Sequence, residues 1–520
     1  MRNRIGVIHP FLFAIFNILF LYYNNIGNVD PGSLIAPLVV TLAFVLVLCI
    51  VVRLFVKDPG RTAVVVSIFV MFFFSYGHFF HAVKPHIDIP IIKNETELTV
   101  MTLTMWVGAL LLLSFFAVKL PSKPNAVGLF LNVVAIILII KPLVGISAYH
   151  LTYTSLKNGW SETDKTRAVS PVPNGDTPNI FLIILDAYAG AGVLDKYYGF
   201  DNSEFVGRLI KKGFFVAENS RSNYCQTGLS MASLLNMRYL DNERDGLKTD
   251  SVYAGPIDAL IRKSEVFRYL RRVGYRIAVI SSGRKEFAIK GVDHFILPRT
   301  GPDEFQNMLI NTTPLPIVLD QLEGANQFDI YRDRMLREFD AAVDASGLKP
   351  PVFVLMHIEA PHPPFVFGRN GEKIDPEIFF QEDDGDRLIR KGRMVRAEYV
   401  KRYIDQLIFI NKKVITMTEA ILARSKKSPV IIIQGDHGPR SMLFWDSPEK
   451  TDLKECMSIL NAYYLPRGIE ALYDAITPVN SFRAVFNGYF NAGYDYLEDK
   501  SFFSTEKAPY RFIEAALEAN

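Results

Sequence analysis

The stretch "NIFLIILDAY", residues 179–188, begins the globular part of the chain and ends a continuous apolar run in an acidic residue, Asp186. A short apolar run rich in β-branched residues is typical of a strand buried on both faces. Three later runs have the same character: "YRIAVI" (275–280), "VFVLMH" (352–357) and "PVIIIQ" (429–434). Segments 255–274 and 397–423 between them have helical periodicity. This alternation predicts an α/β domain with a mostly parallel central sheet covered on both faces.

Metal-binding residue types follow three of these four predicted strands. Asp186 follows the first strand, His357 ends the third with His362 five residues later, and Asp436 and His437 follow the fourth. Taken singly, each has an ordinary explanation, such as a helix cap or a tight turn. Ligands of open α/β sheets bind at the carboxyl ends of the strands, where these side chains would converge. Carboxylates together with imidazoles favour Zn²⁺ or Mn²⁺ over Mg²⁺ or Ca²⁺.

The first 150 residues have a different composition from the rest of the chain. They contain five apolar stretches, at about 5–23, 33–52, 62–82, 98–118 and 126–148. Each is close to the ~20 residues that a helix needs to cross a bilayer. Residues 1–150 are therefore predicted to form a domain of five transmembrane helices.

The basic residues between these stretches predict their orientation. One set of connections and the N-terminus have seven basic residues, and the alternate connections have two: Arg2, Arg4, Arg53, Lys57, Arg61, Lys119 and Lys123 against Lys84 and Lys93. This bias puts the N-terminus in the cytoplasm. Five crossings then put the chain after residue 150 outside, so we expect a multi-pass protein of the cytoplasmic (inner) membrane with a periplasmic or extracellular domain.

Residues 151–178 are predicted to form a linker, because "SETDKTRAVSPVPNGDTPN" (161–179) is polar and rich in Pro, Gly, Ser and Asp. Residues 179–520 then form the globular domain. The net charge of +3 gives no indication of nucleic-acid binding. The three cysteines have no paired spacing, which excludes a disulfide framework and a CxxC metal site.

A stretch rich in potential nucleophiles lies in this domain. "SNYCQTGLSMASLLN" (222–236) contains Cys225, Thr227, Ser230 and Ser233. Thiols and hydroxyls are weak nucleophiles unless they are activated, and a dication at the strand ends would supply an activator. The apolar spacing predicts a helix that begins at or just after Thr227. Its free N–H groups would favour an incoming phosphate or sulfate.

Five motifs occur in the order and roughly the spacing of the alkaline phosphatase and sulfatase superfamily: "NIFLIILDAY", "NYCQTGLSMASLLN", "HIEAPHPPF", "IIIQGDHG" and "NAYYLP" (461–466). This resemblance covers nearly all of 179–490 and implies a sulfatase-like catalytic domain. Five spans followed by an external domain resemble the branch that contains lipoteichoic acid synthases and lipid A phosphoethanolamine transferases.

The resemblance implies a ligand set for one divalent ion, made of Asp186, Thr227, Asp436 and His437. Sulfatases usually have a second aspartate directly after the first, and here Ala187 takes that place. The substitution argues for one tightly held ion and against a Ca²⁺ site of the sulfatase kind.

The resemblance also implies roles in catalysis. Thr227 corresponds to a threonine that ligates the metal and becomes transiently phosphorylated. His357 and His362 correspond to a histidine pair that holds the phosphate and protonates the leaving group. Further candidate substrate contacts are Glu359, Arg440 and Arg221.

Cys225 does not fit the sulfatase nucleophile pattern. True sulfatases oxidise the cysteine of a Cys-x-Pro-x-Arg motif to formylglycine. Here Thr227 stands where the proline should be and Leu229 where the arginine should be. We therefore expect Cys225 to be a structural residue beside the site.

The function implied is metal-dependent transfer of a phospho-alcohol group from a membrane phospholipid to an envelope glycan or lipid, through a phosphothreonine. Two alternatives remain open at this point. One is a sulfatase-like hydrolase of phosphate or sulfate esters that uses the same residues with water. The other is a non-catalytic protein of envelope assembly.

Overall fold

The computed structural model of the 520-residue chain divides into two compact units. The first contains Met1–Ser155 with Gly301–Asn326, and the second contains Leu156–Thr300 with Gln327–Asn520. The structure describes residues 8–26, 31–83, 95–119, 124–159, 177–249, 251–252, 254–284, 287, 289, 292–298, 304–317, 327–374, 384–467 and 469–516. Of the predicted linker, residues 160–176 lie outside these ranges. The boundaries predicted at 150 and 178 stay predictions.

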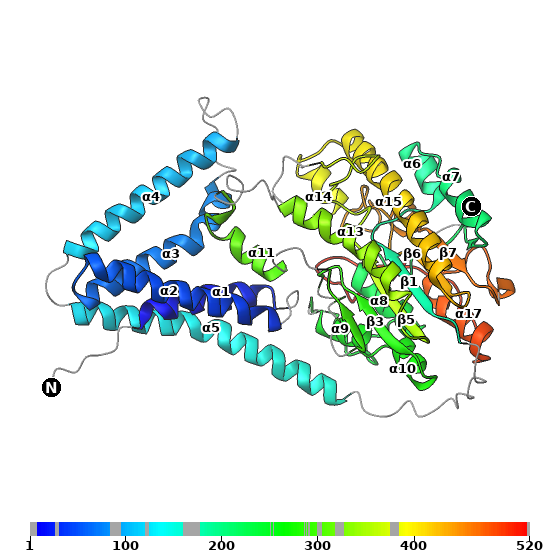
Figure 1. Ribbon diagram of the computed structural model, residues 1–520, viewed down its shortest axis with the longest axis horizontal. Helices are drawn as coiled ribbons and strands as arrows, with labels where there is room; N and C mark the ends of the chain where they lie inside the picture. The colour runs from blue at the N-terminus through cyan, green and yellow to red at the C-terminus, as the bar shows by residue number, and fades with distance from the viewer. Residues whose placement is uncertain are drawn as a thin grey trace. The chain divides into compact units, whose positions relative to one another are not determined.

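The first unit is helical (Figure 1). Its elements are α1 (His9–Asn24), η1 (Pro31–Leu34), α2 (Ile35–Phe55), α3 (Pro59–Val83), α4 (Glu95–Lys119), α5 (Pro124–Gly159) and α11 (Glu304–Asn311). Four segments among the described residues are long and apolar enough to cross a membrane: Gly32–Phe55, Pro59–Phe80, Glu97–Lys119 and Ala126–Tyr149. The predicted span at 5–23 corresponds to α1, which has 16 described residues, so five transmembrane helices are not confirmed.

The outward faces of these helices are apolar. Leu54 and Phe55 at the end of α2 are 72% and 82% exposed, and large apolar side chains of α4 and α5 are exposed as well. A surface of this extent would be unfavourable in water, and it is what a lipid environment requires. The structure therefore supports a membrane anchor.

Helices α1 and α5 run in the same direction. The Ile8 N–H before α1 donates to Asn132 Oδ1 at 3.3 Å, near the start of α5. At the other end of α1, Tyr23 lies against Gly145, where an added Cβ would meet the Tyr23 ring at 2.0 Å. This parallel arrangement is the one that five helices of alternating direction require of the first and the fifth.

Helix α11 packs with the first unit although it lies far from the other helices in the sequence. Phe305 contacts Tyr22 at the end of α1, with ring centroids 6.2 Å apart. The Gly77 N–H of α3 donates to the Thr312 carbonyl oxygen at 2.9 Å. A Cβ at position 77 would lie 2.0 Å from the Asn311 carbonyl oxygen, so only glycine permits this approach.

The second unit contains a seven-stranded sheet. Its strands are β1 (Ile180–Leu185), β2 (Phe215–Val216), β3 (Arg276–Ile280), β4 (His294–Ile296), β5 (Val352–Ile358), β6 (Val430–Gly435) and β7 (Asn461–Tyr464). Their order is β2-β7-β6-β1-β5-β3-β4. Strands β6, β1, β5, β3 and β4 are parallel, whereas β7 is antiparallel to β6 and β2 to β7. The predicted α/β class, the four strands and the mostly parallel sheet are confirmed.

The helices of this unit are α6 (Ala191–Tyr198), α7 (Ser203–Lys211), α8 (Thr227–Asn236), α9 (Gly255–Arg262), α10 (Glu265–Arg272), α13 (Gln327–Ala345), α14 (Gly385–Arg390), α15 (Arg396–Arg424), α16 (Leu453–Met457), η4 (Ile469–Ala471) and α17 (Pro478–Phe490), with a small β8–β9 pair (Phe502–Phe503 and Ile513–Glu514). The predicted helix at 397–423 is α15. The predicted helix at 255–274 is instead two helices, because Ser264 interrupts it and its side chain caps α10 through the Phe267 N–H.

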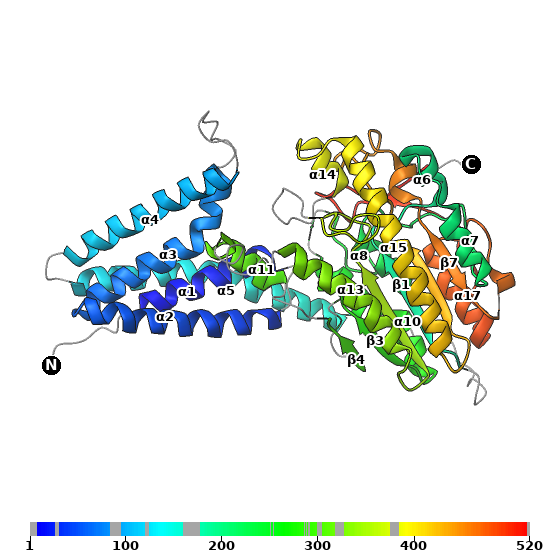
Figure 2. The same ribbon diagram turned by 45° about the horizontal axis from the view of Figure 1, so that its top comes forward.

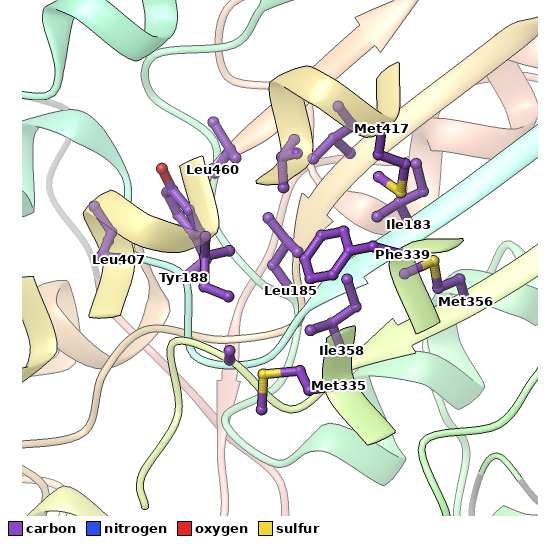
Figure 3. Close-up of a cluster of buried hydrophobic side chains, with 14 of the residues drawn as sticks. Ile183, Leu185, Tyr188, Met335, Phe339, Met356, Ile358, Leu407, Met417 and Leu460 are labelled. Carbon is purple, nitrogen blue, oxygen red and sulfur yellow. The ribbon is translucent and has the colours of Figure 1, made fainter. Parts of the chain in front are cut away.

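The sheet is covered on both faces, as the continuous apolar strands predict. Ile183 and Leu185 of β1 pack among Met335 and Phe339 of α13 and Met417 of α15 (Figure 3). Helices α13 and α15 lie side by side over this face (Figure 2). The alternate β1 residues, Ile180, Leu182 and Ile184, belong to a second cluster with α8, α10 and α17.

Candidate active site

Three adjacent parallel strands bring the predicted ligands together at one edge of the sheet. Leu185 of β1 is in register with Ile358 of β5 and with Gly435 of β6, so the carboxyl ends of the strands align. Asp186, His357 and Asp436 form a buried group whose ligand atoms all lie within 4.8 Å of one another. Among the described residues, this is the only His, Cys, Asp and Glu group of that kind.

The Asp186 carboxylate lies between two imidazoles. Its Oδ1 is 3.2 Å from His437 Nε2, and its Oδ2 is 3.5 Å from His357 Nε2. His437 Nε2 is also 3.3 Å from Asp436 Oδ2. Burial opposes ionisation of Asp186, but the imidazoles of His362, His437 and His357 lower its pKa well below the usual range.

The oxygens of this group have the chemistry of metal ligands. Neither oxygen of Asp186 nor Oδ2 of Asp436 accepts a hydrogen bond from any residue that the structure describes, although all three atoms are buried. Buried carboxylates without donors are costly, and a bound cation removes that cost. The set therefore fits one divalent ion held by carboxylates and imidazole.

Thr227 is the first residue of α8, which confirms the predicted start of that helix. Its Oγ1 lies 3.2 Å from His437 Nε2. The Ser230 hydroxyl instead donates to the Asp436 carbonyl oxygen at 2.7 Å, and that of Ser233 to the Arg238 carbonyl oxygen at 2.8 Å. Of these three residues, only Thr227 also lines a cavity.

His357 has a different environment from the one its predicted acid role suggests. Its ring stacks on Phe287 with centroids 3.9 Å apart, and its Nδ1 lies 3.4 Å from Ser282 Oγ. Nε2 faces Asp186, and His357 does not line the cavity beside Thr227. This geometry suits a metal ligand or a ligand-orienting group, and the acid role of His357 stays a prediction.

Cys225 lies in an apolar cluster with Leu443, Trp445, Cys456, Met457 and Phe503. Its side chain is fully buried, and its Sγ lies 3.7 Å from the Ser504 carbonyl oxygen. Burial raises the pKa of the Cys225 thiol, which disfavours the reactive thiolate. This environment fits the expected structural role.

A cavity of about 270 Å³ opens beside Thr227. Its walls carry more cationic than anionic side chains, and the lining residues are Gln226, Thr227, Gly228, Arg284, His362, Asp384, Arg387, Arg440, Trp445 and Glu506. Arg284 Nη1 lies 3.6 Å from Asp186 Oδ2 and so joins the cavity to the metal-ligand group. Such a wall favours an anionic group.

His362 lines this cavity and is held by two acceptors. Its Nδ1 lies 2.6 Å from the Pro363 carbonyl oxygen, and its Nε2 lies 3.2 Å from Asp384 Oδ1. Burial alone would lower the pKa of His362, but the carboxylates of Asp186 and Asp384 outweigh it and raise the pKa to about 9. Both carboxylates thus favour the protonated form of His362.

Of the three other predicted substrate contacts, only one lines the cavity. Arg440 lines the cavity, but Arg221 does not. Glu359 is buried, and its carboxylate pairs with Arg334 at 2.5 Å. This ion pair is a structural contact within the unit, and Glu359 is not among the residues that line the cavity.

Two further cavity residues, Asp384 and Arg284, are not among the predicted site residues. Asp384 stands in an acidic run, "EDDGD" (382–386), that follows no predicted strand. Arg284 could have been found, because "SSGR" (281–284) comes directly after β3, at the strand end where ligands bind.

No family model and no curated protein matches the chain. Among solved structures, similar ones include the C-terminal periplasmic domain of EcEptC from Escherichia coli in complex with Zn, with 11% identity over 67% of this chain and 96% of that chain and a TM-score of 0.41. Another is the integral membrane protein lipooligosaccharide phosphoethanolamine transferase A (EptA) from Neisseria meningitidis, with 13% identity, coverage of 91% and 94%, and a TM-score of 0.39.

A third is the putative sulfatase yidJ from Bacteroides fragilis, with 12% identity over 65% of this chain and 84% of that chain and a TM-score of 0.39. These likenesses are distant, so the functional proposal rests on the residues of this chain.

Proposed function

We propose that the chain is a metal-dependent enzyme that transfers a phospho-alcohol group from a membrane phospholipid to an envelope glycan or lipid, with Thr227 as the nucleophile. One observation carries the proposal. The Thr227 hydroxyl lies at the start of α8, 3.2 Å from His437 Nε2, which in turn lies 3.2 Å from Asp186 Oδ1. Thr227 also lines a cavity whose walls carry more cationic than anionic side chains. A nucleophile, a cation site and an anion-binding wall thus meet at one point.

Asp186, Thr227, Asp436 and His437 would hold the ion, and His357 Nε2 lies near enough to the same carboxylate to join them. The mixture of carboxylate and imidazole favours Zn²⁺ or Mn²⁺ over Mg²⁺ or Ca²⁺. When bound, such an ion lowers the pKa of the coordinated hydroxyl and offsets negative charge on the phosphoryl oxygens.

The proposed reaction consists of two displacements at phosphorus, and residues of the chain act in both. Thr227 Oγ1, its proton lost to solvent, forms a bond to phosphorus while the bond from phosphorus to the lipid alcohol oxygen breaks. His362 gives a proton to that leaving oxygen. In the second displacement, neutral His362 takes a proton from the acceptor alcohol, whose oxygen attacks phosphorus and releases Thr227.

His362 suits the acid role better than His357 does. It lines the cavity where the leaving group would lie, and its Nε2 lies 3.2 Å from Asp384 Oδ1, a carboxylate that favours the protonated imidazole. The first α8 residues add backbone N–H groups at the end of the helix that favours anions.

An external location supports a lipid donor, because no nucleotide is available outside the cytoplasm. Helices α1 and α5 run in the same direction, as five crossings require. Segment 304–312 packs against the end of α1 and the second half of α3. The end of the bundle that this segment contacts is the one that the basic-residue bias puts outside.

Reporter fusions test this topology. A reporter joined after residue 160 should be active only outside the cytoplasm, and one joined after Lys57 only inside. A cytoplasmic signal after residue 160 would mean that α1 does not cross the membrane.

The covalent step is tested by mass. Purified full chain loaded with Zn²⁺ is incubated with a labelled phospholipid in the absence of acceptor and quenched in acid. We expect an adduct of about 80 Da or more on the peptide that contains Thr227, because withholding the acceptor slows the second displacement. Turnover without any adduct at Thr227, or an adduct at Ser230 or Ser233, would contradict the assignment.

Product analysis in the same experiment tests the alternative of a hydrolase. Release of the free phospho-alcohol at the same rate with and without acceptor would identify water as the natural acceptor. The buried Cys225, which lies outside the cavity lining, disfavours a formylglycine sulfatase. A chain that binds no divalent ion would indicate a non-catalytic protein.

A further inference from the structure

The lining of the cavity beside Thr227 includes a compact charged triad, made of His362, Asp384 and Arg440. A single oxygen, Asp384 Oδ1, is 2.7 Å from Arg440 Nη1 and 3.2 Å from His362 Nε2. All three side chains are at most 13% exposed. A guanidinium and an imidazole therefore share one carboxylate oxygen in an environment that excludes most solvent.

Asp384 does not do what its position in the chain would suggest. It is the N-cap residue of α14, where an aspartate side chain usually accepts a hydrogen bond from the first turn. Its carboxylate makes no such bond and is directed to His362 and Arg440 instead. Capping of α14 therefore does not explain this residue.

Arg440 has a backbone conformation that only the surrounding structure can maintain. Its φ is +60°, in the left-handed region that disfavours residues with a Cβ. Its guanidinium carbon lies 5.4 Å from the centre of the Trp445 ring. Local backbone strain of this kind gathers at functional sites, where it directs a side chain toward a ligand.

One N–H group of the Arg440 guanidinium has no acceptor among the described residues. Arg440 Nε is buried and has no hydrogen-bond partner among the residues that the structure describes. A buried donor without an acceptor is costly, and an anion in the cavity would supply the acceptor. Arginine binds phosphate through two N–H groups at once, so one edge can serve Asp384 while others serve a phosphoryl group.

We propose that Asp384 is a positioning residue that holds His362 and Arg440 as one clamp for the phosphoryl group opposite Thr227. Arg440 binds the non-bridging oxygens, and His362 lies beside the leaving oxygen to which it gives its proton. Asp384 fixes both side chains without contacting the substrate. This inference rests on the proposed function, and it adds a residue that the sequence motifs do not contain.

The structure offers a matched control two residues away. Asp386 is on the same helix, its side chain is 1% exposed, and it pairs with Arg390. It does not line the cavity. Asp384→Asn and Asp386→Asn thus each remove one buried negative charge that faces an arginine, and only the first alters the clamp.

The experiment uses the full chain loaded with Zn²⁺, with a chromogenic aryl phosphodiester as substrate and inorganic phosphate as the binding probe. For Asp384→Asn we expect kcat to fall roughly 10- to 100-fold, as for the loss of a supporting group behind a ligand. KM and Zn²⁺ content should change less than about threefold, phosphate affinity should fall, and Asp384→Glu should recover part of kcat. Asp386→Asn should leave kcat and phosphate affinity within about twofold of wild type.

Two outcomes would overturn the inference. One is wild-type kcat and phosphate affinity in Asp384→Asn. The other is equal losses in both variants with a lowered unfolding temperature, which would indicate a structural role only. Failure of the proposed function is a separate result: no adduct at Thr227 would remove the covalent mechanism, while a selective loss of phosphate affinity in Asp384→Asn would still support the clamp.

Discussion

The two acidic residues at the centre of the site differ in how their charge is balanced. Both oxygens of Asp186 are buried without a hydrogen bond from any described residue, and imidazoles lie 3.2 and 3.5 Å away. The negative charge of Asp384 is balanced by Arg440, whose Nη1 lies 2.7 Å from Asp384 Oδ1. Burial alone would raise the pKa of Asp384, but Arg440 outweighs it and holds the pKa well below its usual range. Among the described residues, Asp186 thus has only one guanidinium near it, that of Arg284 at 3.6 Å, and leaves room for a bound cation, whereas Asp384 contacts a guanidinium directly.

This difference has a functional consequence. Metal ligands have to be neutral imidazoles and ionised carboxylates, so occupancy of the proposed metal site depends on pH as well as on the concentration of the ion. An arginine cannot leave the clamp. Variants of the two groups should consequently separate into those that lose the metal and those that keep it.

The largest effect is expected at the metal centre. Asp436→Asn or His437→Ala should lower affinity for Zn²⁺ by at least about 100-fold and reduce turnover to background, since either change leaves an incomplete ligand set. Elemental analysis of the purified chain measures the metal directly. Normal metal content in both variants would remove these residues from the ligand set and would also remove the contrast with Asp384.

Loss of the nucleophile should affect chemistry more than metal binding. Thr227→Ala should lower kcat by roughly 10⁴-fold or more, as nucleophile removal does elsewhere. Much of the bound metal should remain, because Asp186, Asp436 and His437 still provide ligands. Thr227→Ser is the matched variant, since it keeps the hydroxyl and should keep part of the activity. Comparable activity in the alanine variant and the wild type would exclude covalent catalysis by this residue.

The two histidines should respond differently. His357→Ala should lower affinity for Zn²⁺ by about 10- to 100-fold, because its Nε2 faces Asp186 in the metal centre. His362→Ala should keep the metal and lower kcat by about 10²- to 10⁴-fold, the usual contribution of a general acid. Titration of apo protein with Zn²⁺ and single-turnover kinetics measure the two quantities. Equal metal loss in both variants would mean that the metal centre and the clamp are not separate.

The smallest effect on activity is expected at Cys225. Cys225→Ser should keep kcat within about threefold, since the thiol lies in an apolar cluster outside the cavity lining. The buried hydroxyl should lower the free energy of unfolding by about 1–3 kcal/mol. Activity is measured well below the unfolding temperature, and the mass of the native peptide is measured in parallel. A dead variant together with a formylglycine mass at Cys225 would reverse the assignment in favour of a sulfatase.

The sequence by itself determined the elements that carry the proposed metal ligands. Runs such as "NIFLIIL" and "PVIIIQ" can only be satisfied by burial on both faces, and parallel strands bring the residues that follow them to one edge. Asp186, Asp436 and His437 could be located for that reason. The helix that begins at Thr227 followed from its local apolar spacing.

Only the tertiary structure decided how side chains far apart in the sequence divide between the two groups. His357 and His362 are five residues apart in one motif, yet one faces Asp186 and the other faces Asp384, because β5 ends between them and the chain changes direction. Asp384 follows no strand, and its role depends on contacts with two residues 22 and 56 positions away. Segment 304–312 packs with the first unit because Gly77 leaves room for it. Periodicity records which face of an element is buried, whereas the partner that buries it is fixed by long-range packing.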